Sequence, residues 1–266
     1  MSVSETYAAD LAALAWLVEL GADEAVGETP VDRFALAEAP PAPRREAAPA
    51  VAAAPKPAPP VDPSLESAAI AAACGTLEAL RAAVTGYEGC ALKKGARSTV
   101  FADGNPLARL MVIGEAPGRE EDQAGLPFVG RSGRLLDLML AAIGLSRKAD
   151  DPKDSVYISN VLPWRPPGNR EPSSDEVAMM APFLFRHVEL KAPEAILLLG
   201  SPATRTVLGT KQGVARMRGK WAEWRGIPVM PTWHPAALLR DPAKKREAWA
   251  DLLMLSARLE GEGRGA

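Results

Sequence analysis

The chain has 266 residues, with 31 Lys and Arg against 33 Asp and Glu, and only two cysteines. This length fits one sizeable domain with an appendage, and two cysteines make a disulfide framework unexpected. No apolar run approaches the 18 residues of a membrane span, and the first residues lack the basic region of a secretory signal. We therefore expect a cytoplasmic protein without a membrane partner.

The charges are unevenly distributed along the chain. Residues 1–90 carry 5 Lys and Arg and 13 Asp and Glu, a balance of −8. Residues 91–266 carry 26 Lys and Arg and 20 Asp and Glu, a balance of +6. A basic C-terminal part suits a polyanion such as nucleic acid, although an ordinary mixed surface explains the totals equally well.

Two segments precede the main domain. Within residues 1–38, apolar side chains between positions 5 and 26 recur at helical spacing and predict an N-terminal helical segment. Residues 39–63 contain 9 Pro and 9 Ala, a composition typical of a semi-rigid linker. The sequence leaves open whether the N-terminal helix docks on the main domain or binds a partner.

Residues 64–266 are predicted to form the main domain. A helix over 64–86 begins after Asp62-Pro63 and is interrupted, without necessarily ending, at Gly75. Beyond residue 91, short apolar strands alternate with helices, which indicates βαβ units around a parallel sheet covered on both faces. Residues 209–226 are expected to form a hairpin or a long loop. The expected strands are 110–115, 156–162, 195–199 and 227–232, and the expected helices are 132–143, 174–190, 201–208 and 242–259.

Polar residues follow the first of these strands. The stretch Gly114-Glu-Ala-Pro-Gly118 ends it, and Glu121, Asp122 and Phe128 lie in the loop beyond. Ligands of open α/β sheets bind just beyond the carboxyl ends of strands, so these residues are placed where a site is expected. The stretch matches neither a dinucleotide fingerprint nor a P-loop, and a tight strand-to-loop turn is the alternative interpretation.

A second candidate position is Asn160, near the end of the next strand. A buried amide needs partners, and its acceptor and two donors can match the edge of a nucleobase. In isolation, an Asn that satisfies a neighbouring loop is the more common case. The loop that follows contains Arg165 and Arg170, whose guanidinium groups suit phosphate.

The chain has two histidines. His187 lies among apolar residues of a helix, and we interpret it as structural. His234 follows a strand and precedes Pro235, where a neutral imidazole can donate to a developing anion. Beyond it, Leu238 and Leu239 either staple the next helix or form a wedge for a base stack, with Arg240 following.

Together these motifs resemble the uracil-DNA glycosylase superfamily, most closely its family-4 type. The resemblance covers residues 74–256 and rests on several motifs in the same order. It implies a three-layer α/β/α sandwich with a central four-stranded, mainly parallel sheet. The motifs are Gly-Glu-Ala-Pro-Gly-x-x-Glu-Asp, Gly-x-Pro-Phe-Val-Gly-x-Ser-Gly-x-Leu-Leu, Tyr-Ile-Ser-Asn-Val, Arg-Pro-Pro-Gly-Asn-Arg-x-Pro and His-Pro-Ala-x-Leu-Leu-Arg.

The resemblance also implies a role for each site residue. Phe128 would stack on uracil flipped out of DNA, Asn160 would bind its edge, and Glu121 would exclude the methyl group of thymine. His234 would stabilise the leaving uracil anion. The backbone at Glu115 and Ala116 would hold a uracil oxygen, and the Glu115 side chain would position the attacking water. Leu238 would fill the gap in the duplex, with Arg165, Arg170 and Arg240 as DNA-binding residues.

One departure from the family concerns its iron–sulfur cluster, which requires four cysteines. The corresponding positions here are Tyr87, Cys90, Trp164 and Met180, so only Cys90 matches, and Cys74 lies too far upstream to substitute. We therefore expect no cluster, no metal and no other cofactor, with bulky side chains filling the space. The chain also lacks the Arg-rich insert of the covalently trapping relatives before its second histidine.

Three functional hypotheses follow. The first is a monofunctional uracil-DNA glycosylase of base excision repair, a monomer that associates with the nucleoid when bound to DNA. The second is a protein of the same fold that recognises uracil or abasic DNA without cleavage. The third, compatible with the first, is an N-terminal segment that binds a replication or repair protein.

Overall fold

The computed structural model describes residues 10, 11, 14, 16 and 63–262. By its internal contacts the chain separates into residues 1–56 and residues 57–266. The predicted N-terminal helical segment, residues 1–38, and the linker, residues 39–63, lie almost entirely outside the described residues.

The second unit is built on a mixed sheet of six strands in the order β1-β3-β2-β4-β6-β5. The four central strands are parallel, and the two short edge strands pair antiparallel with their neighbours. All four predicted strands are therefore confirmed, and β1 and β5 are additional. The strands are β1 (Ala102–Gly104), β2 (Leu110–Gly114), β3 (Val156–Asn160), β4 (Ala195–Leu199), β5 (Ala222–Trp224) and β6 (Ile227–Thr232).

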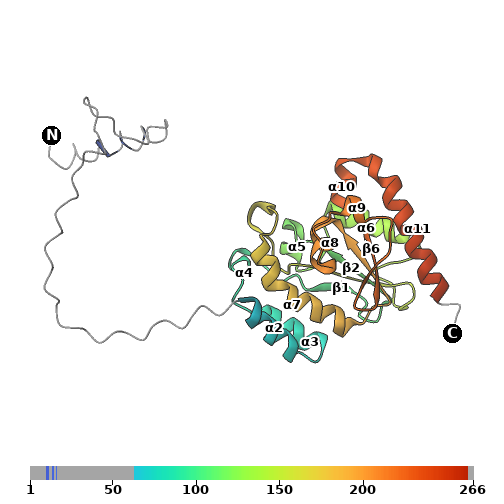
Figure 1. Ribbon diagram of the computed structural model, residues 1–266, viewed down its shortest axis with the longest axis horizontal. Coiled ribbons are helices and arrows are strands. Elements are labelled where there is room, and N and C mark those ends of the chain that lie inside the picture. The colour runs from blue at the N-terminus through green and yellow to red at the C-terminus, as the bar shows by residue number, and fades with distance from the viewer. Residues whose placement is uncertain (1–9, 12–13, 15, 17–62, 263–266) are drawn as a thin grey trace, which may run out of the picture. The chain divides into compact units, whose positions relative to one another are not determined.

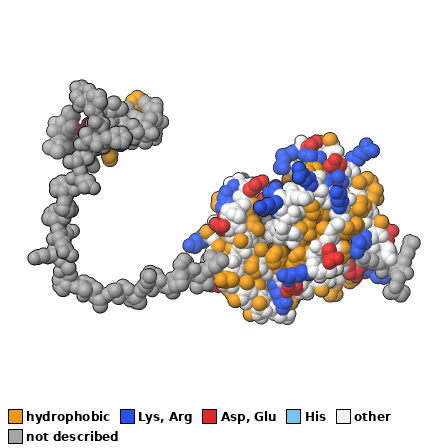
Figure 2. Space-filling model, in the orientation of Figure 1, with side chains coloured by type: hydrophobic (Ala, Val, Ile, Leu, Met, Phe, Trp, Pro, Cys, Tyr) orange, Lys and Arg blue, Asp and Glu red, His pale blue; other side chains and the backbone are white. Residues whose placement is uncertain are grey.

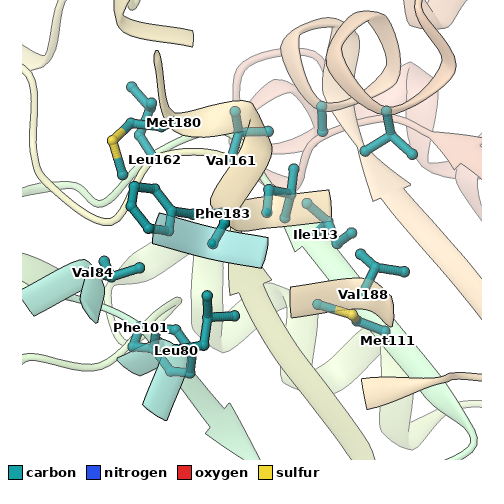
Figure 3. Close-up of a cluster of buried hydrophobic side chains, with 14 of the residues drawn as sticks. Leu80, Val84, Phe101, Met111, Ile113, Val161, Leu162, Met180, Phe183 and Val188 are labelled. Atoms are coloured by element: carbon teal, nitrogen blue, oxygen red, sulfur yellow. The ribbon is translucent and has the colours of Figure 1, made fainter. Parts of the chain in front are cut away.

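Helices cover both faces of the sheet and make three layers (Figure 1). Met111 and Ile113 of β2 pack into the core beneath α2, α3, α7 and α8, part of which is shown in Figure 3. Leu110 and Val112 of the same strand pack into the opposite core, beneath α6 and α11. Because alternate side chains of a strand point to opposite faces, a strand buried on both sides is apolar throughout.

The helices match the predicted pattern with one correction. The single helix expected over 64–86 is wrong, because α2 ends at Ala73 and α3 begins at Leu77. Arg186 donates two hydrogen bonds to the Cys74 carbonyl, at 3.0 and 2.9 Å, and Thr76 caps α3 by accepting from the Ala79 N–H. The helices are α2 (Pro63–Ala73), α3 (Leu77–Gly86), α4 (Leu92–Gly95), α5 (Arg119–Ala124), α6 (Arg131–Ala141), α7 (Ser174–Lys191), α8 (Gly200–Leu208), α9 (Val214–Met217), α10 (Pro235–Arg240) and α11 (Lys245–Glu262), with short 3-10 turns at Pro167–Asn169 and Pro242–Lys244.

The predicted segment 209–226 contains α9 and ends in the β5–β6 hairpin. Among the described helices, none has the length and apolar character needed to cross a membrane. The parallel strands β3, β2, β4 and β6 end side by side at Asn160, Gly114, Leu199 and Thr232. The loops that follow these four ends therefore converge on one edge of the sheet, where the sequence predicted a site.

Candidate active site at the strand ends

A cavity of about 520 Å³ opens at the carboxyl ends of the parallel strands. Loops after all four strands line it, including Gly200 after β4 and Trp233 after β6. This volume lies within the usual range for ligand pockets. Eight of the predicted site residues line the cavity, namely Glu115, Ala116, Glu121, Phe128, Asn160, Arg170, His234 and Arg240.

The Phe128 ring forms one wall of the cavity. The side chain is 5% exposed, and its ring centre lies 5.5 Å from that of His234, with the rings tilted by 32°. A Cβ atom at Gly114 would lie 2.4 Å from Phe128 Cζ and 2.5 Å from Asn160 Oδ1. Only glycine therefore allows the ring and the amide to approach the end of β2 so closely, and the two converge on one point.

Asn160 is buried with its acceptor unused. Its side chain is 6% exposed, and Oδ1 has no hydrogen-bond partner within the described part of the chain. An unpaired buried acceptor lowers the stability of the fold by about 1–3 kcal/mol. Because the amide lines the cavity, a ligand that carries an N–H donor on a flat edge would satisfy it.

His234 caps α10 and is held in one tautomer. Its Nδ1 accepts from the Ala236 backbone N–H at 3.1 Å, so the neutral ring carries its proton on Nε2. Burial, with a smaller contribution from Arg240, lowers the pKa of His234 to about 4. Gly200, at φ +88°, leaves room for the imidazole, because a Cβ there would lie 3.1 Å from His234 Cβ. The site thus holds a neutral imidazole that can donate from Nε2.

Glu115 is the carboxyl group at the end of β2. Burial raises its pKa, and the neighbouring Glu171 raises that pKa further. A carboxylate disfavoured in this way is a better proton acceptor than an exposed one. Glu115 can therefore orient a water molecule in the cavity and take up its proton.

Glu121 and Asp122 organise the loops around the cavity. Glu121 Oε1 accepts from Val129 N at 3.0 Å and Gly130 N at 2.9 Å, and Oε2 accepts from Gly118 N at 3.1 Å. Asp122 Oδ1 accepts from two backbone N–H groups of another loop, at 2.8 and 3.1 Å. Glu121 thus lines the cavity while joining the loop after β2 to the loop that carries Phe128.

A second hollow of about 430 Å³ extends the mouth of the cavity. Arg119, Arg131 and Arg240 line it, together with the 40% exposed Leu239. None of these three arginines forms an ion pair with any residue in the described ranges. Figure 2 shows Lys and Arg side chains gathered over this part of the surface, near α10. Glu120 and Glu121 also line the hollow, so its lining carries three basic and two acidic side chains, a small positive balance that suits a polyanion.

The other two predicted arginines are partly engaged within the protein. Arg165 Nε donates to Asn169 Oδ1 at 2.7 Å. Arg170 forms a two-bond ion pair with Glu176, at 2.9 and 2.6 Å, which holds the pKa of Glu176 at about 2. Of these two, only Arg170 lines the cavity, and its guanidinium group is already shared with a carboxylate.

Leu238 is not at the surface where the sequence interpretation placed it. It is a 1% exposed residue of α10 that lines a separate apolar hollow together with Leu135 of α6 and Leu252 of α11. This disagrees with the expectation of a wedge at Leu238, because a buried side chain cannot enter a base stack without a shift of α10. The alternative interpretation, that it staples the helix, fits its position.

The four positions assigned to the cluster ligands lie in one hydrophobic core. Tyr87, Cys90, Trp164 and Met180 are each at most 4% exposed. Tyr87 packs edge-on against Phe183, with 5.2 Å between ring centres, and Trp164 Nε1 donates to Thr99 Oγ1 at 3.1 Å. A phenol, an indole and a thioether do not provide the thiolate ligands of an iron–sulfur cluster, so this donor set does not fit one.

Sequence reasoning missed several residues that the tertiary structure brings to the site. Arg119 and Arg131 begin α5 and α6, and Glu171 lies in the loop after β3, where no periodic pattern marks them. Gly200 could have been noticed, since a glycine directly after a buried strand often marks a close approach of the backbone. His187 was interpreted correctly as structural, because its Nε2 bonds Tyr157 OH at 2.9 Å in the core.

The fold and this arrangement of strand-end loops define the class of protein. The uracil DNA glycosylase superfamily model matches residues 101–253, more than half of the chain, and the protein belongs to this superfamily. It is 38% identical over 177 residues to a type-4 uracil-DNA glycosylase of Sulfurisphaera tokodaii, covering 63% of this chain and 77% of the relative. It is 39% identical over 154 residues to the type-4 enzyme of Thermotoga maritima, covering 57% and 77%. With that of Pyrobaculum aerophilum it shares 35% identity over 186 residues, covering 67% and 92%.

Proposed function

We propose that the protein is a monofunctional uracil-DNA glycosylase that hydrolyses the N-glycosidic bond of uracil flipped out of DNA and leaves an abasic site. The observation that carries this proposal is the unpaired Oδ1 of Asn160 beside the Phe128 ring. Uracil presents an N–H donor next to a carbonyl acceptor, which is the complement of a side-chain amide. The type-4 names of the relatives support the same activity.

The proposed reaction separates charge across the cavity. As the bond between N1 of uracil and C1′ of the sugar breaks, negative charge develops on the base, and Nε2–H of His234 stabilises it. Glu115 orients the attacking water and takes up its proton as the new bond to C1′ forms. A histidine whose pKa is about 4 stays neutral at physiological pH, so it acts as a hydrogen-bond donor rather than as a cation.

Base selectivity is proposed to come from Asn160 and Glu121. The amide favours uracil over cytosine, because cytosine has an acceptor where uracil has its N–H group. Glu121 is held by three backbone N–H groups, so it forms a fixed wall of the cavity. We propose that this wall excludes the methyl group of thymine.

The mouth is proposed to bind the DNA backbone through Arg119, Arg131 and Arg240, with Arg165 and Arg170 as further contacts. The exposed Leu239 is proposed as the wedge in place of Leu238, because it lies among these arginines. In that case Leu239→Ala slows cleavage of uracil in double-stranded DNA more than in single strands. Equal effects on the two substrates would contradict a wedge at this position.

We also propose that catalysis needs no iron–sulfur cluster. Three of the four positions carry side chains that cannot bind iron as thiolates, and they pack in the core. Purified protein is expected to lack visible charge-transfer absorption and stoichiometric iron. A brown protein with about four irons per chain would overturn this proposal.

The decisive experiment is alkali-revealed strand cleavage of a uracil-containing oligonucleotide, without added metal, beside a thymine control. Cleavage at uracil alone is the expected result. Tighter binding of the uracil strand without cleavage would favour a protein that recognises uracil without excising it. The absence of both cleavage and preferential binding would refute the proposed activity. We further propose that the protein is a cytoplasmic monomer. The N-terminal segment, which is predicted to bind a replication or repair protein, lies almost entirely outside the described residues.

A further inference from the structure

Phe128 is held in a backbone conformation that its side chain disfavours. Its φ is +54°, in the left-handed region that residues other than Gly, Asn and Asp rarely occupy. Such a conformation persists only where the surrounding structure enforces it. The contacts around its carbonyl group therefore determine where the ring lies in the cavity.

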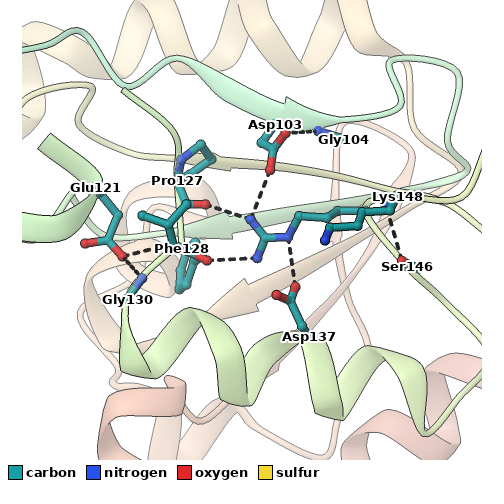
Figure 4. A network of polar contacts seen from close by, with 11 residues as sticks. Asp103, Gly104, Glu121, Pro127, Phe128, Gly130, Asp137, Ser146 and Lys148 are labelled. Atoms are coloured by element: carbon teal, nitrogen blue, oxygen red, sulfur yellow. Dashed lines mark hydrogen bonds and ion pairs between the residues drawn. The ribbon is translucent and has the colours of Figure 1, made fainter. Parts of the chain in front are cut away.

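Arg147, in the loop between α6 and β3, supplies those contacts. Figure 4 labels the residues to which its guanidinium group is bonded and draws these bonds as dashed lines. Its Nη1 donates to the Pro127 carbonyl at 2.8 Å, and its Nη2 donates to the Phe128 carbonyl at 3.0 Å. The guanidinium group is itself anchored by Asp103 of β1, at 3.1 Å, and by Asp137 of α6, at 2.8 Å. One side chain, 8% exposed, thus joins the Phe128 loop to a strand and a helix.

Two further features act on the same loop. Gly133 of α6 lies against the Phe128 carbonyl, and a Cβ there would come within 1.8 Å of that oxygen. On the other side, Glu121 accepts from the N–H groups of Val129 and Gly130. The loop is therefore fixed through its carbonyl groups by Arg147 and through its N–H groups by Glu121.

We infer that Arg147 is a positioning residue for catalysis, which holds the Phe128 ring at the distance and angle needed to stack on the flipped base. Its catalytic consequence rests on the proposed function, while the structural clamp does not. Among the described residues, Arg147 does not line the cavity and forms no hydrogen bond with the end of β3 that carries Asn160. It therefore acts through Phe128. Lysine cannot replace it, because a single ammonium group lacks the planar set of donors that reaches both carbonyls and both carboxylates.

The test compares Arg147→Lys with Arg109→Lys. Arg109 makes the same kinds of contact at the opposite end of the sheet, with Glu194 at 2.5 Å and the Leu259 carbonyl at 2.7 Å. Arg147→Lys is expected to lower kcat/KM on uracil-DNA by roughly 10- to 100-fold, because a displaced positioning group costs about that factor. It is also expected to weaken inhibition by free uracil. Arg109→Lys should change neither quantity.

A double-mutant cycle distinguishes a general structural defect in Arg147→Lys from an effect that is transmitted through Phe128. In a Phe128→Leu background, Arg147→Lys should add little further loss, because its effect passes through the aromatic ring. Full additivity of the two losses would overturn the inference. If Arg147→Lys does not fold, Asp137→Asn, at a half-exposed anchor, should produce a smaller loss with the same coupling.

Amide hydrogen exchange gives a readout that needs no activity. Val129 and Gly130 should exchange faster in Arg147→Lys than in Arg109→Lys, since the loop loses one of its two attachments. Unchanged exchange would overturn the clamp even in an active enzyme. Faster exchange in a protein whose wild type does not cleave uracil-DNA would refute only the proposed function.

Discussion

The strand-end cavity and the buried cluster of Tyr87, Cys90, Trp164 and Met180 belong to one domain but obey different rules. In the cavity, polar atoms are oriented and in part unpaired, as at Asn160 Oδ1. In the buried cluster, aromatic rings and a thioether fill space within the hydrophobic core.

The two regions differ in what they require of their side chains: the cavity requires polar atoms at particular positions, and the core requires a filled volume. A ligand pocket depends on individual donors and acceptors, so its residues cannot be exchanged for others of similar size. A packed core depends mainly on filling space with apolar groups, and many side chains can do this. Most residues of the predicted site line the cavity, while three of the four positions that the sequence analysis assigned to cluster ligands carry residues other than cysteine. Four variants test this separation.

The largest expected effect is on stability in the buried cluster. Trp164→Ala removes a side chain that is 1% exposed and should lower the free energy of unfolding by about 3–5 kcal/mol. Urea denaturation measures this loss. Trp249→Ala, at a 42% exposed position, is the matched control with a small expected change. Cleavage by Trp164→Ala well below its melting temperature should stay near the wild-type rate, and a large loss there would break the separation.

His234→Leu should have the largest effect on activity. Loss of the Nε2–H donor is expected to reduce kcat by about 10²–10³-fold, as for other donors to a developing anion. Single-turnover cleavage of a uracil oligonucleotide measures it. His187→Gln is the control within the same chain, because that histidine bonds Tyr157 in the core, and it should lower stability without this loss of rate. Equal losses of rate would contradict the assignment.

Asn160→Asp should change base selectivity. The carboxylate lacks the amide donors, so the rate of uracil cleavage is expected to fall. Cytosine, which the wild type is expected to reject, should then be cleaved slowly. Competition between uracil and cytosine oligonucleotides gives the ratio of kcat/KM. Asn105→Asp, in the loop after β1, should leave this ratio unchanged. Wild-type rates in both Asn160→Asp and Asn160→Ala would show that this residue does not contact the base.

The smallest expected effect concerns pH. Glu171 raises the pKa of Glu115, so Glu171→Gln should lower that pKa. If Glu115 acts as a base, activity is retained in its ionised form and is lost as pH falls through its pKa. The acid limb of kcat/KM should therefore move to lower pH in Glu171→Gln and stay in place in Glu194→Gln. A shift to higher pH would exclude Glu115 as the group that titrates.

Much of the fold was accessible from local pattern. The four central strands are mostly apolar and buried because both faces of the sheet are covered, and this pattern is visible in the chain itself. The short edge strands β1 and β5 have three residues each and carry no such signal. The break between α2 and α3 has a local part, the cap that Thr76 provides for α3, and a tertiary part, because Arg186, more than a hundred residues away, donates to the Cys74 carbonyl.

The chemistry of the site was equally a matter of local motifs, since Glu115, Asn160 and His234 each lie at the end of a recognisable strand or within two residues of it. Three-dimensional contacts decided how most of these residues are held. The unpaired oxygen of Asn160 and the clamp of Arg147 on Phe128 depend on contacts between separate segments of the chain. The tautomer of His234 is instead set locally, by the N–H group of Ala236 two residues further along. Leu239, and not Leu238, lies at the mouth of the cavity, because the packing of α10 on its neighbouring helices determines which of the two adjacent leucines is buried. A sequence determines which chemical groups are present, and packing determines which of them face the ligand.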